Sequence, residues 1–171
     1  MTKFQKAYPI STKHLELIGA LAAQWTFLEY ALLLAICEVT NPKEVPDGLF
    51  LGWNLGFWSR IDLLKVYANA IKQEHESEGA RLNAILQRIG EVYALRNKYV
   101  HGLWITNGKP NEPHLINLRL KGKLALSNDQ ITTTQMTNDA NEIWEAADAF
   151  LTFMQGHGFL KGLLPSHGTP E

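Results

Sequence analysis

Four polar side chains, Arg96, Asn97, Lys98 and His101, gather at the end of an otherwise apolar stretch. On a helix, Asn97 and His101 lie on the same face because they are four residues apart. Arg96 falls on the stripe that carries Ile89, where burying a guanidinium is costly unless it meets an anion or opens onto a groove. An imidazole moves protons near neutral pH, and a guanidinium holds phosphate oxygens. The cluster therefore predicts acid–base chemistry on an anionic substrate, or an anion-binding site.

The pair Arg96-Asn97, followed by three residues and His101, resembles the R-N-x-x-x-H signature of the HEPN superfamily. Those domains are helical bundles, often toxins or defence nucleases, in which two subunits commonly pair so that both motifs face one cleft. The resemblance implies a homodimeric, metal-independent endoribonuclease without a cofactor, in which the ribose 2'-hydroxyl attacks the adjacent phosphate. His101 would move the proton, and Arg96 would hold the phosphate. Asn97 would orient His101 or a phosphate oxygen.

The resemblance also bears on partners. HEPN toxins controlled by nucleotidyltransferase partners often carry a tyrosine two residues after the motif histidine, and this chain has Leu103 there. The sequence therefore argues against a modifying partner of that kind. RNA, a second copy of the chain and an antitoxin protein are the partners that the family suggests.

Other residues are candidates for supporting roles. Glu29 continues the apolar stripe of the first predicted helix, so its carboxylate needs a cation. Arg96 is the favoured partner and Arg60 the competitor. If Glu29 pairs with Arg96, it would position the motif from behind. The alternative is that Glu29 reaches solvent at the edge of the bundle.

Basic and aromatic residues near the motif could contact RNA. The candidates are Lys98, Arg119, Lys121 and Trp104. Cations would follow the RNA backbone and the indole would stack on a base. A solvated strand edge that lysines protect from aggregation explains the basic residues as well, and hydrophobic packing is the common fate of a tryptophan.

The elements that would position these residues follow from the spacing of apolar side chains. Recurrences of three and four residues predict four long helices, over 12–38, 57–75, 77–101 and from about 134 to just before Gly156. The motif then lies at the end of the third helix. Gly102 suits the left-handed position that follows a helix end.

Between the third and fourth helices the pattern changes to that of a small β-meander, over about 103–126. Residues 103–106 precede Asn107-Gly108, a strong hairpin-turn dipeptide, and 116–121 alternate between apolar and polar. Lys121-Gly122 turns the chain again. We therefore expect a mainly α fold, a four-helix-type bundle over 12–156 with this β insertion, within one domain spanning 1–171 and ending in a flexible tail over 159–171.

Composition narrows the class of protein. The chain has 171 residues, a formal charge of -1, 46% hydrophobic residues and a single cysteine, Cys37. These values exclude a disordered chain, binding of nucleic acid through bulk charge, and a disulfide framework. We expect a cytoplasmic protein, because no secretory signal is evident and the apolar run 27–39 is too short to cross a bilayer.

Two alternatives to the ribonuclease hypothesis stay open. The first is a non-catalytic bundle that binds a protein partner. The second is a nucleotide- or small-ligand-binding bundle, with Arg96 as the anion clamp in an apolar groove lined by Trp25 or Trp104.

Overall fold

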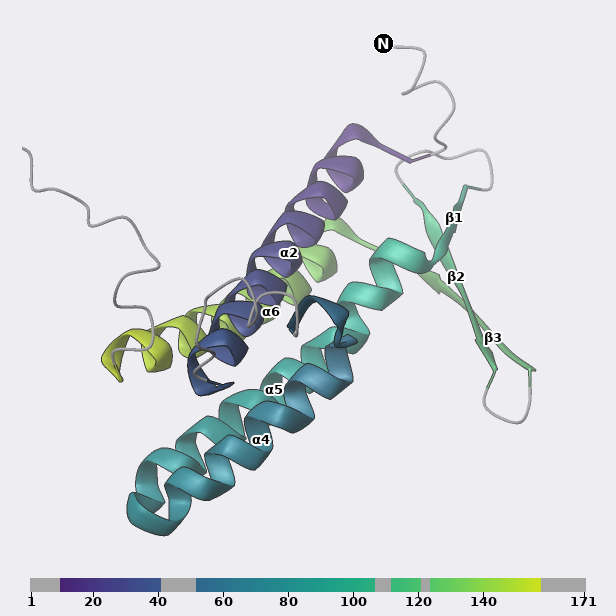
Figure 1. Ribbon diagram of the computed structural model, residues 1–171. Coiled ribbons are helices and arrows are strands. Elements are labelled where there is room, and N and C mark those ends of the chain that lie inside the picture. Colours follow the sequence, from purple (N-terminus) through teal and green to yellow (C-terminus); the bar gives the residue numbers. More distant parts are fainter. Residues whose placement is uncertain (1–9, 41–51, 107–111, 121–123, 158–171) are drawn as a thin grey trace, which may run out of the picture. The chain divides into compact units, whose positions relative to one another are not determined.

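A computed structural model describes residues 10–40, 52–106, 112–120 and 124–157. Within these ranges the protein is mainly helical, and its long helices are α2 (Thr12–Thr40), α4 (Phe57–Glu74), α5 (Glu76–His101) and α6 (Thr133–Gly156) (Figure 1). A three-stranded antiparallel sheet lies between α5 and α6 in the sequence. The predicted fold class, four long helices with a β insertion before the fourth, is confirmed.

The chain divides into two compact units, each made of two stretches. The first unit comprises residues 1–25 and 91–144, and the second comprises 26–90 and 145–171. The division falls inside α2, α5 and α6, so each of these helices contributes one part to each unit. The single domain expected over 1–171 stays a prediction.

The first unit contains the start of α2, the end of α5, the sheet and the start of α6. Its core is formed by buried apolar side chains from all of these elements, among them Leu21, Trp25, Val92, Tyr99, Leu115, Ile131, Met136 and Ile143. His14 is the buried polar residue of this core, only 3% exposed. Its Nδ1 lies 2.7 Å from Ser11 Oγ and its Nε2 lies 3.3 Å from the carbonyl oxygen of Ile131, which fastens the start of α2 to the segment before α6.

The sheet has the order β1-β2-β3, with β1 at Leu103–Ile105, β2 at His114–Leu120 and β3 at Leu124–Gln130. Trp104 pairs with Leu115 and faces the core side, where Leu115 is fully buried. The predicted meander is confirmed, and its third strand continues past residue 126 to Gln130. The predicted turns at Asn107-Gly108 and Lys121-Gly122 lie outside the described residues.

The second unit contains the rest of α2, all of α4, the start of α5 and the end of α6. Helices α4 and α5 run side by side after a tight turn at His75, whose N–H donates to the carbonyl of Ile71 at 2.7 Å (Figure 1). A Cβ on Gly79 would lie 2.5 Å from the carbonyl oxygen of Ala68, so only glycine permits this approach of the two helices. Buried apolar residues from all four helices form the core, among them Leu28, Leu32, Ile61, Leu64, Leu82, Leu86, Phe150 and Phe153.

Helix α2 passes a length and composition test for a membrane span, with a mean hydropathy of 1.5 over an 18-residue window. The run 27–39, which is too short to cross a bilayer, is only part of this helix, so the expectation from that run alone is corrected. Of that window, 56% is buried inside the protein, and the core helix of a soluble protein passes the same test. The helix is therefore weak evidence for a membrane, and its burial agrees with the expected core role.

Candidate functional site

The three residues of the motif meet at the end of α5. Arg96 Nη1 donates a hydrogen bond to Asn97 Oδ1 at 2.9 Å and lies 2.6 Å from His101 Nε2. A guanidinium carries only donors, so Nε2 is the acceptor in this contact. A hydrogen bond between these two atoms therefore requires the tautomer of His101 in which Nε2 carries no proton. The structure thus brings together the three side chains that the sequence analysis selected, and it adds a direct link between Arg96 and His101.

Aromatic rings support the guanidinium of Arg96. Its central carbon lies 6.0 Å from the ring centroid of Trp25, which is buried and lies 5.6 Å from the ring of Tyr93. Such cation–π contacts favour a cation that is partly withdrawn from water. Arg96 Nε is buried and has no hydrogen-bond acceptor among the described residues. The guanidinium thus lies over the Trp25 ring, and its Nη1 contacts the exposed His101.

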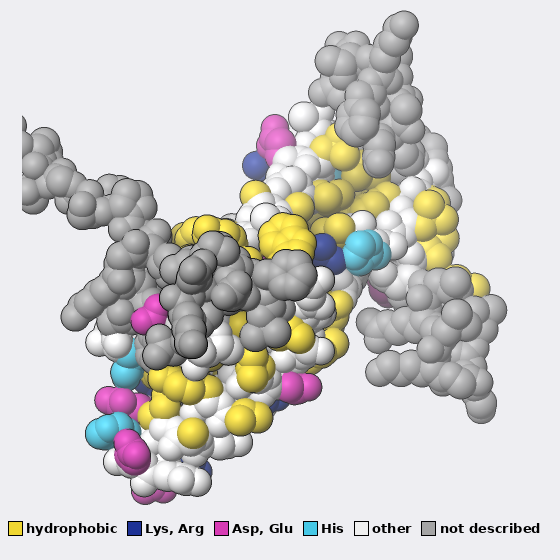
Figure 2. Space-filling model, viewed as in Figure 1, with side chains coloured by type: hydrophobic (Ala, Val, Ile, Leu, Met, Phe, Trp, Pro, Cys, Tyr) yellow, Lys and Arg dark blue, Asp and Glu magenta, His cyan; other side chains and the backbone are white. Residues whose placement is uncertain are grey.

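Among the described residues, the hydrogen-bond partners of Arg96 carry no carboxylate. On the face drawn in Figure 2, hydrophobic side chains cover much of the described surface, and charged side chains and histidines lie in small groups among them. Within the described part of the first unit, these partners are Asn97 and His101. A guanidinium near solvent whose partners carry no negative charge can bind a phosphate group.

Lys98 is engaged inside the protein. Its Nζ lies 3.9 Å from Asp139 Oδ2, donates to the hydroxyl of Tyr99 at 3.3 Å, and lies 4.8 Å from the centre of the Tyr99 ring. The Lys98 and Asp139 side chains are only 19% and 15% exposed. These contacts fasten α5 to α6, and an RNA contact of Lys98 stays a prediction.

Trp104 packs against the same turn from β1. Its ring stacks on Tyr99 with centroids 6.2 Å apart, and its Nε1–H donates to the Tyr99 carbonyl at 3.1 Å. The ring of His14 meets Trp104 edge-on at 6.2 Å. The indole therefore has both its ring and its N–H engaged in the fold, and base stacking by Trp104 stays a prediction.

Gly102 joins the motif helix to β1, but for a reason other than the one predicted. Its φ does not lie in the left-handed region, so the expectation of a left-handed residue here is wrong. A Cβ on Gly102 would lie 2.4 Å from Leu115 Cδ1 and 2.6 Å from the carbonyl oxygen of Lys98. The position requires glycine because Leu115 of β2 and the Lys98 carbonyl occupy the space that a Cβ would need.

The remaining candidates are less well defined. Glu29 is half-buried on α2 but belongs to the second unit, whereas Arg96 belongs to the first, so their pairing stays a prediction. Arg60, the alternative partner, donates from Nε to the carbonyl of Gly52 at 3.0 Å. Arg119 pairs with Ala125 in the sheet register, and its side chain lies outside what is described, as does the whole of Lys121.

The sequence analysis missed two residues that hold the motif in place. Tyr99, only 1% exposed, donates a very short hydrogen bond from its hydroxyl to Asp139 Oδ2. Burial and the hydrogen bond to Asp139 raise the pKa of Tyr99 well above its ordinary value. Tyr99 could have been selected from the sequence, because its aromatic ring lies among the polar residues of the motif segment. No sequence pattern pointed to Asp139, because it lies 40 residues away from Tyr99 along the chain.

Neither metal ligation nor similarity to known proteins adds to this geometry. Within the described ranges, no group of three or more His, Cys, Asp or Glu side chains is placed to hold a metal ion. Comparison of the chain with protein-family models, with curated proteins and with solved structures finds no match. The candidate site therefore rests on its own residues and their geometry.

Proposed function

We propose that the protein is a HEPN-like endoribonuclease that cleaves RNA with Arg96, Asn97 and His101, without a metal ion. One observation carries the proposal: Arg96 Nη1 contacts both Asn97 Oδ1 and His101 Nε2, so the motif forms a single cluster beside solvent. A group that can accept a proton, His101, is thus in direct contact with a cation that can bind phosphate, Arg96.

The cluster supports the following reaction. A phosphate of RNA draws Arg96 Nη1 onto its oxygens, which releases Nε2 of His101 from its contact with the guanidinium. Nε2 then takes the proton of the ribose 2'-hydroxyl, and the 2'-oxygen forms a bond to phosphorus. The bond from phosphorus to the 5'-oxygen breaks, which leaves a 2',3'-cyclic phosphate on one fragment. Arg96 stabilises the charge on the phosphate oxygens during this exchange.

The departing 5'-oxygen needs a proton that His101 of the same chain, acting as base, does not supply. In a homodimer, His101 of a second copy can serve as this acid, and each chain contributes one imidazole to the pair. We therefore include a homodimer in the proposal. A cytoplasmic role as a toxin or defence protein, with RNA as substrate and an antitoxin as a further partner, completes it.

The test is cleavage of total RNA in excess EDTA by the wild type and by His101→Ala and Arg96→Ala. Both variants should lose roughly 10²-fold or more in rate, because each removes a group that acts in the transition state. His75→Ala is the matched control, since His75 is exposed in the second unit, and it should cut like the wild type. Circular dichroism and sedimentation should show that all variants keep their fold and oligomeric state.

A second candidate function is favoured by the aromatic support beneath Arg96. A guanidinium over Trp25, with Nε buried and without an acceptor, is also suited to clamp the anionic part of a nucleotide. If the wild type cuts nothing but nucleotides raise its melting temperature, and Arg96→Ala abolishes that rise, this binding function replaces the ribonuclease. If neither effect is seen, a protein-interaction module is the remaining hypothesis.

A further inference from the structure

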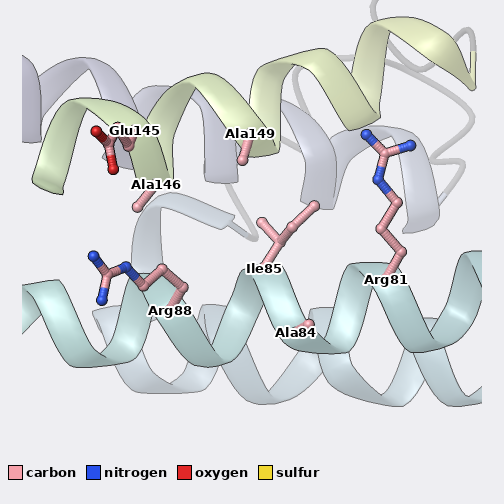
Figure 3. Close-up of a pocket in the computed structure, with 7 residues that line it drawn as sticks. All are labelled: Arg81, Ala84, Ile85, Arg88, Glu145, Ala146 and Ala149. Carbon is pink, nitrogen blue, oxygen red and sulfur yellow. The ribbon is translucent and has the colours of Figure 1, made fainter.

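A groove runs between α5 and α6 within the second unit, away from the residues assigned to RNA cleavage. It is lined by Arg81, Ala84, Ile85 and Arg88 of α5 and by Glu145, Ala146 and Ala149 of α6, and its volume is about 290 Å³ (Figure 3). Three of the seven lining residues are alanines, so small side chains leave the space open. The walls between the charged ends are apolar.

The two ends of the groove differ in charge. Figure 3 places Arg88 and Glu145 together at one end, where a carboxylate on α6 faces the same space as the guanidinium on α5. Arg81 stands alone at the other end. The opposite charges of Arg88 and Glu145 offset each other at the first end, so an anionic ligand is attracted more strongly by Arg81 at the second.

The guanidinium of Arg81 is available to an anion. Its central carbon lies 5.9 Å from the centre of the Phe153 ring, and among the described residues it makes no hydrogen bond or ion pair. The nearest acidic residue before it on α5, Glu78, is paired instead with His157, whose Nε2 lies 3.2 Å from Glu78 Oε2. The ring of Phe153 orients Arg81 without neutralising its charge.

The volume of the groove limits the size of the ligand that it can hold. A volume of about 290 Å³ equals that of about ten waters at roughly 30 Å³ each, at the lower end of ligand sites. A helix from a protein partner, about 10 Å or more in diameter, does not fit such a space. Arg81 and Arg88 are seven residues apart, or roughly 10 Å along the helix axis. A single unbranched apolar chain suits this length and width.

We propose that this groove binds the anion of a medium-chain fatty acid. The carboxylate meets the Arg81 guanidinium, and the alkyl chain lies along Ala84, Ile85 and Ala149 toward the end formed by Arg88 and Glu145. This inference is independent of the ribonuclease proposal, because it uses other residues in the other unit.

Octanoate, octanol and octylamine are the probes, since they share a chain and differ in the charge of the head group. Calorimetric titration of the full-length protein should show binding of octanoate, at least tenfold weaker binding of octanol, and no binding of octylamine. Equal binding of all three would mean that only the chain is recognised, which overturns the proposal. Binding of a glutamate-rich peptide but not of octanoate would assign the groove to a protein partner and overturn it too.

Two variants locate the ligand. Arg81→Gln should weaken octanoate binding by roughly tenfold or more, because a charge-assisted contact is lost, and should leave octanol binding unchanged. Ala84→Leu should block both ligands by filling the groove, and the exposed position of Ala84 on α5 lets the helix accept leucine. Lys72→Gln, an exposed cation on α4, is the matched control and should bind octanoate like the wild type. Octanoate binding that survives both Arg81→Gln and Ala84→Leu would refute the assigned site.

Discussion

The hydroxyl of Tyr99 on α5 donates to the carboxylate of Asp139 on α6, which makes Tyr99 the link between the motif-bearing turn and a second helix. Lys98 Nζ lies 3.9 Å from the same carboxylate oxygen, and the ring of Trp104 stacks on the ring of Tyr99. The end of α5, which carries Arg96, Asn97 and His101, is thus fastened to α6 by a largely buried polar network. The first predictions concern this network.

Removal of the Tyr99 hydroxyl should destabilise the protein. Tyr99→Phe keeps the ring but takes the donor from Asp139, and a buried group that loses its partner costs about 1–3 kcal/mol. Urea unfolding should show this loss in the free energy of unfolding. The double variant Tyr99→Phe with Asp139→Asn should lose less than the sum of the two single variants, and strict additivity would contradict the proposed pairing.

Stability should also fall at high pH because of Tyr99. Burial, followed by the hydrogen bond to Asp139 and the charge of that carboxylate, raises the pKa of Tyr99 above its ordinary value of 10.0. Above about pH 10 the unfolded chain releases this proton while the folded protein keeps it, so the free energy of unfolding decreases as pH rises. Unfolding should be measured from about pH 8 to about pH 11, on both sides of the ordinary tyrosine pKa of about 10. The free energy of unfolding should decrease less over this range for Tyr99→Phe than for the wild type. An equal decrease in both proteins would mean that Tyr99 ionises normally in the fold.

Lysine should not replace Arg96. An ammonium is a point charge without the planar fork, so it does not contact Asn97 Oδ1 and a phosphate in the geometry that the guanidinium offers. Arg96→Lys should lower kcat/KM for RNA cleavage by roughly 10²-fold or more. Arg60→Lys is the same exchange on α4 and serves as the control. If Arg96→Lys retained full activity, charge alone would explain the role of Arg96.

The tautomer of His101 should be visible by nitrogen NMR. Because Arg96 Nη1 donates to Nε2, the neutral imidazole should carry its proton on Nδ1, and the Nε2 signal should have the shift of an unprotonated nitrogen. Arg96→Ala removes this donor, and the Nδ1-protonated population should then fall. A spectrum with the proton on Nε2 in the wild type at a pH where the ring is neutral would refute the contact.

Two glycines should respond in opposite directions to alanine. Gly102→Ala places a Cβ against Leu115 and the Lys98 carbonyl and should destabilise the protein by about 1–3 kcal/mol, the usual cost of overpacking. Gly19→Ala has no atom within 4 Å of the new Cβ on α2 and should stabilise it by about 0.5–1 kcal/mol. Thermal unfolding of both variants tests the pair. Equal shifts would show that the close approach at Gly102 relaxes at little cost.

Periodicity predicted the helices well, because each carries a regular apolar stripe between local stop signals. Thr12 and Phe57 begin helices as expected, and α5 ends at His101. The third strand was predicted too short because residues 127–130 are mostly polar, whereas pairing with β2 depends on backbone hydrogen bonds and continues to Gln130. The alternation of apolar and polar side chains therefore underestimates the length of a strand whose last residues face solvent.

The candidate site was predictable only in its local part. Arg96, Asn97 and His101 lie within two helical turns, and their spacing placed Asn97 and His101 on one face, whereas the contact of Arg96 with His101 was not predicted. The contact between Tyr99 and Asp139 joins different helices, and the aromatic support from Trp25 comes from a third. Contacts of that kind depend on tertiary packing, which no spacing rule reports from a single sequence.

The two compact units alternate along the chain, in the order first, second, first, second. No single cut of the gene therefore separates one whole unit from the other: any truncation removes part of both or leaves one incomplete. A single recombination event likewise could not transfer the unit that carries the Arg96 motif into another protein by itself. Fragments of the chain are therefore poor material for testing its proposed activity.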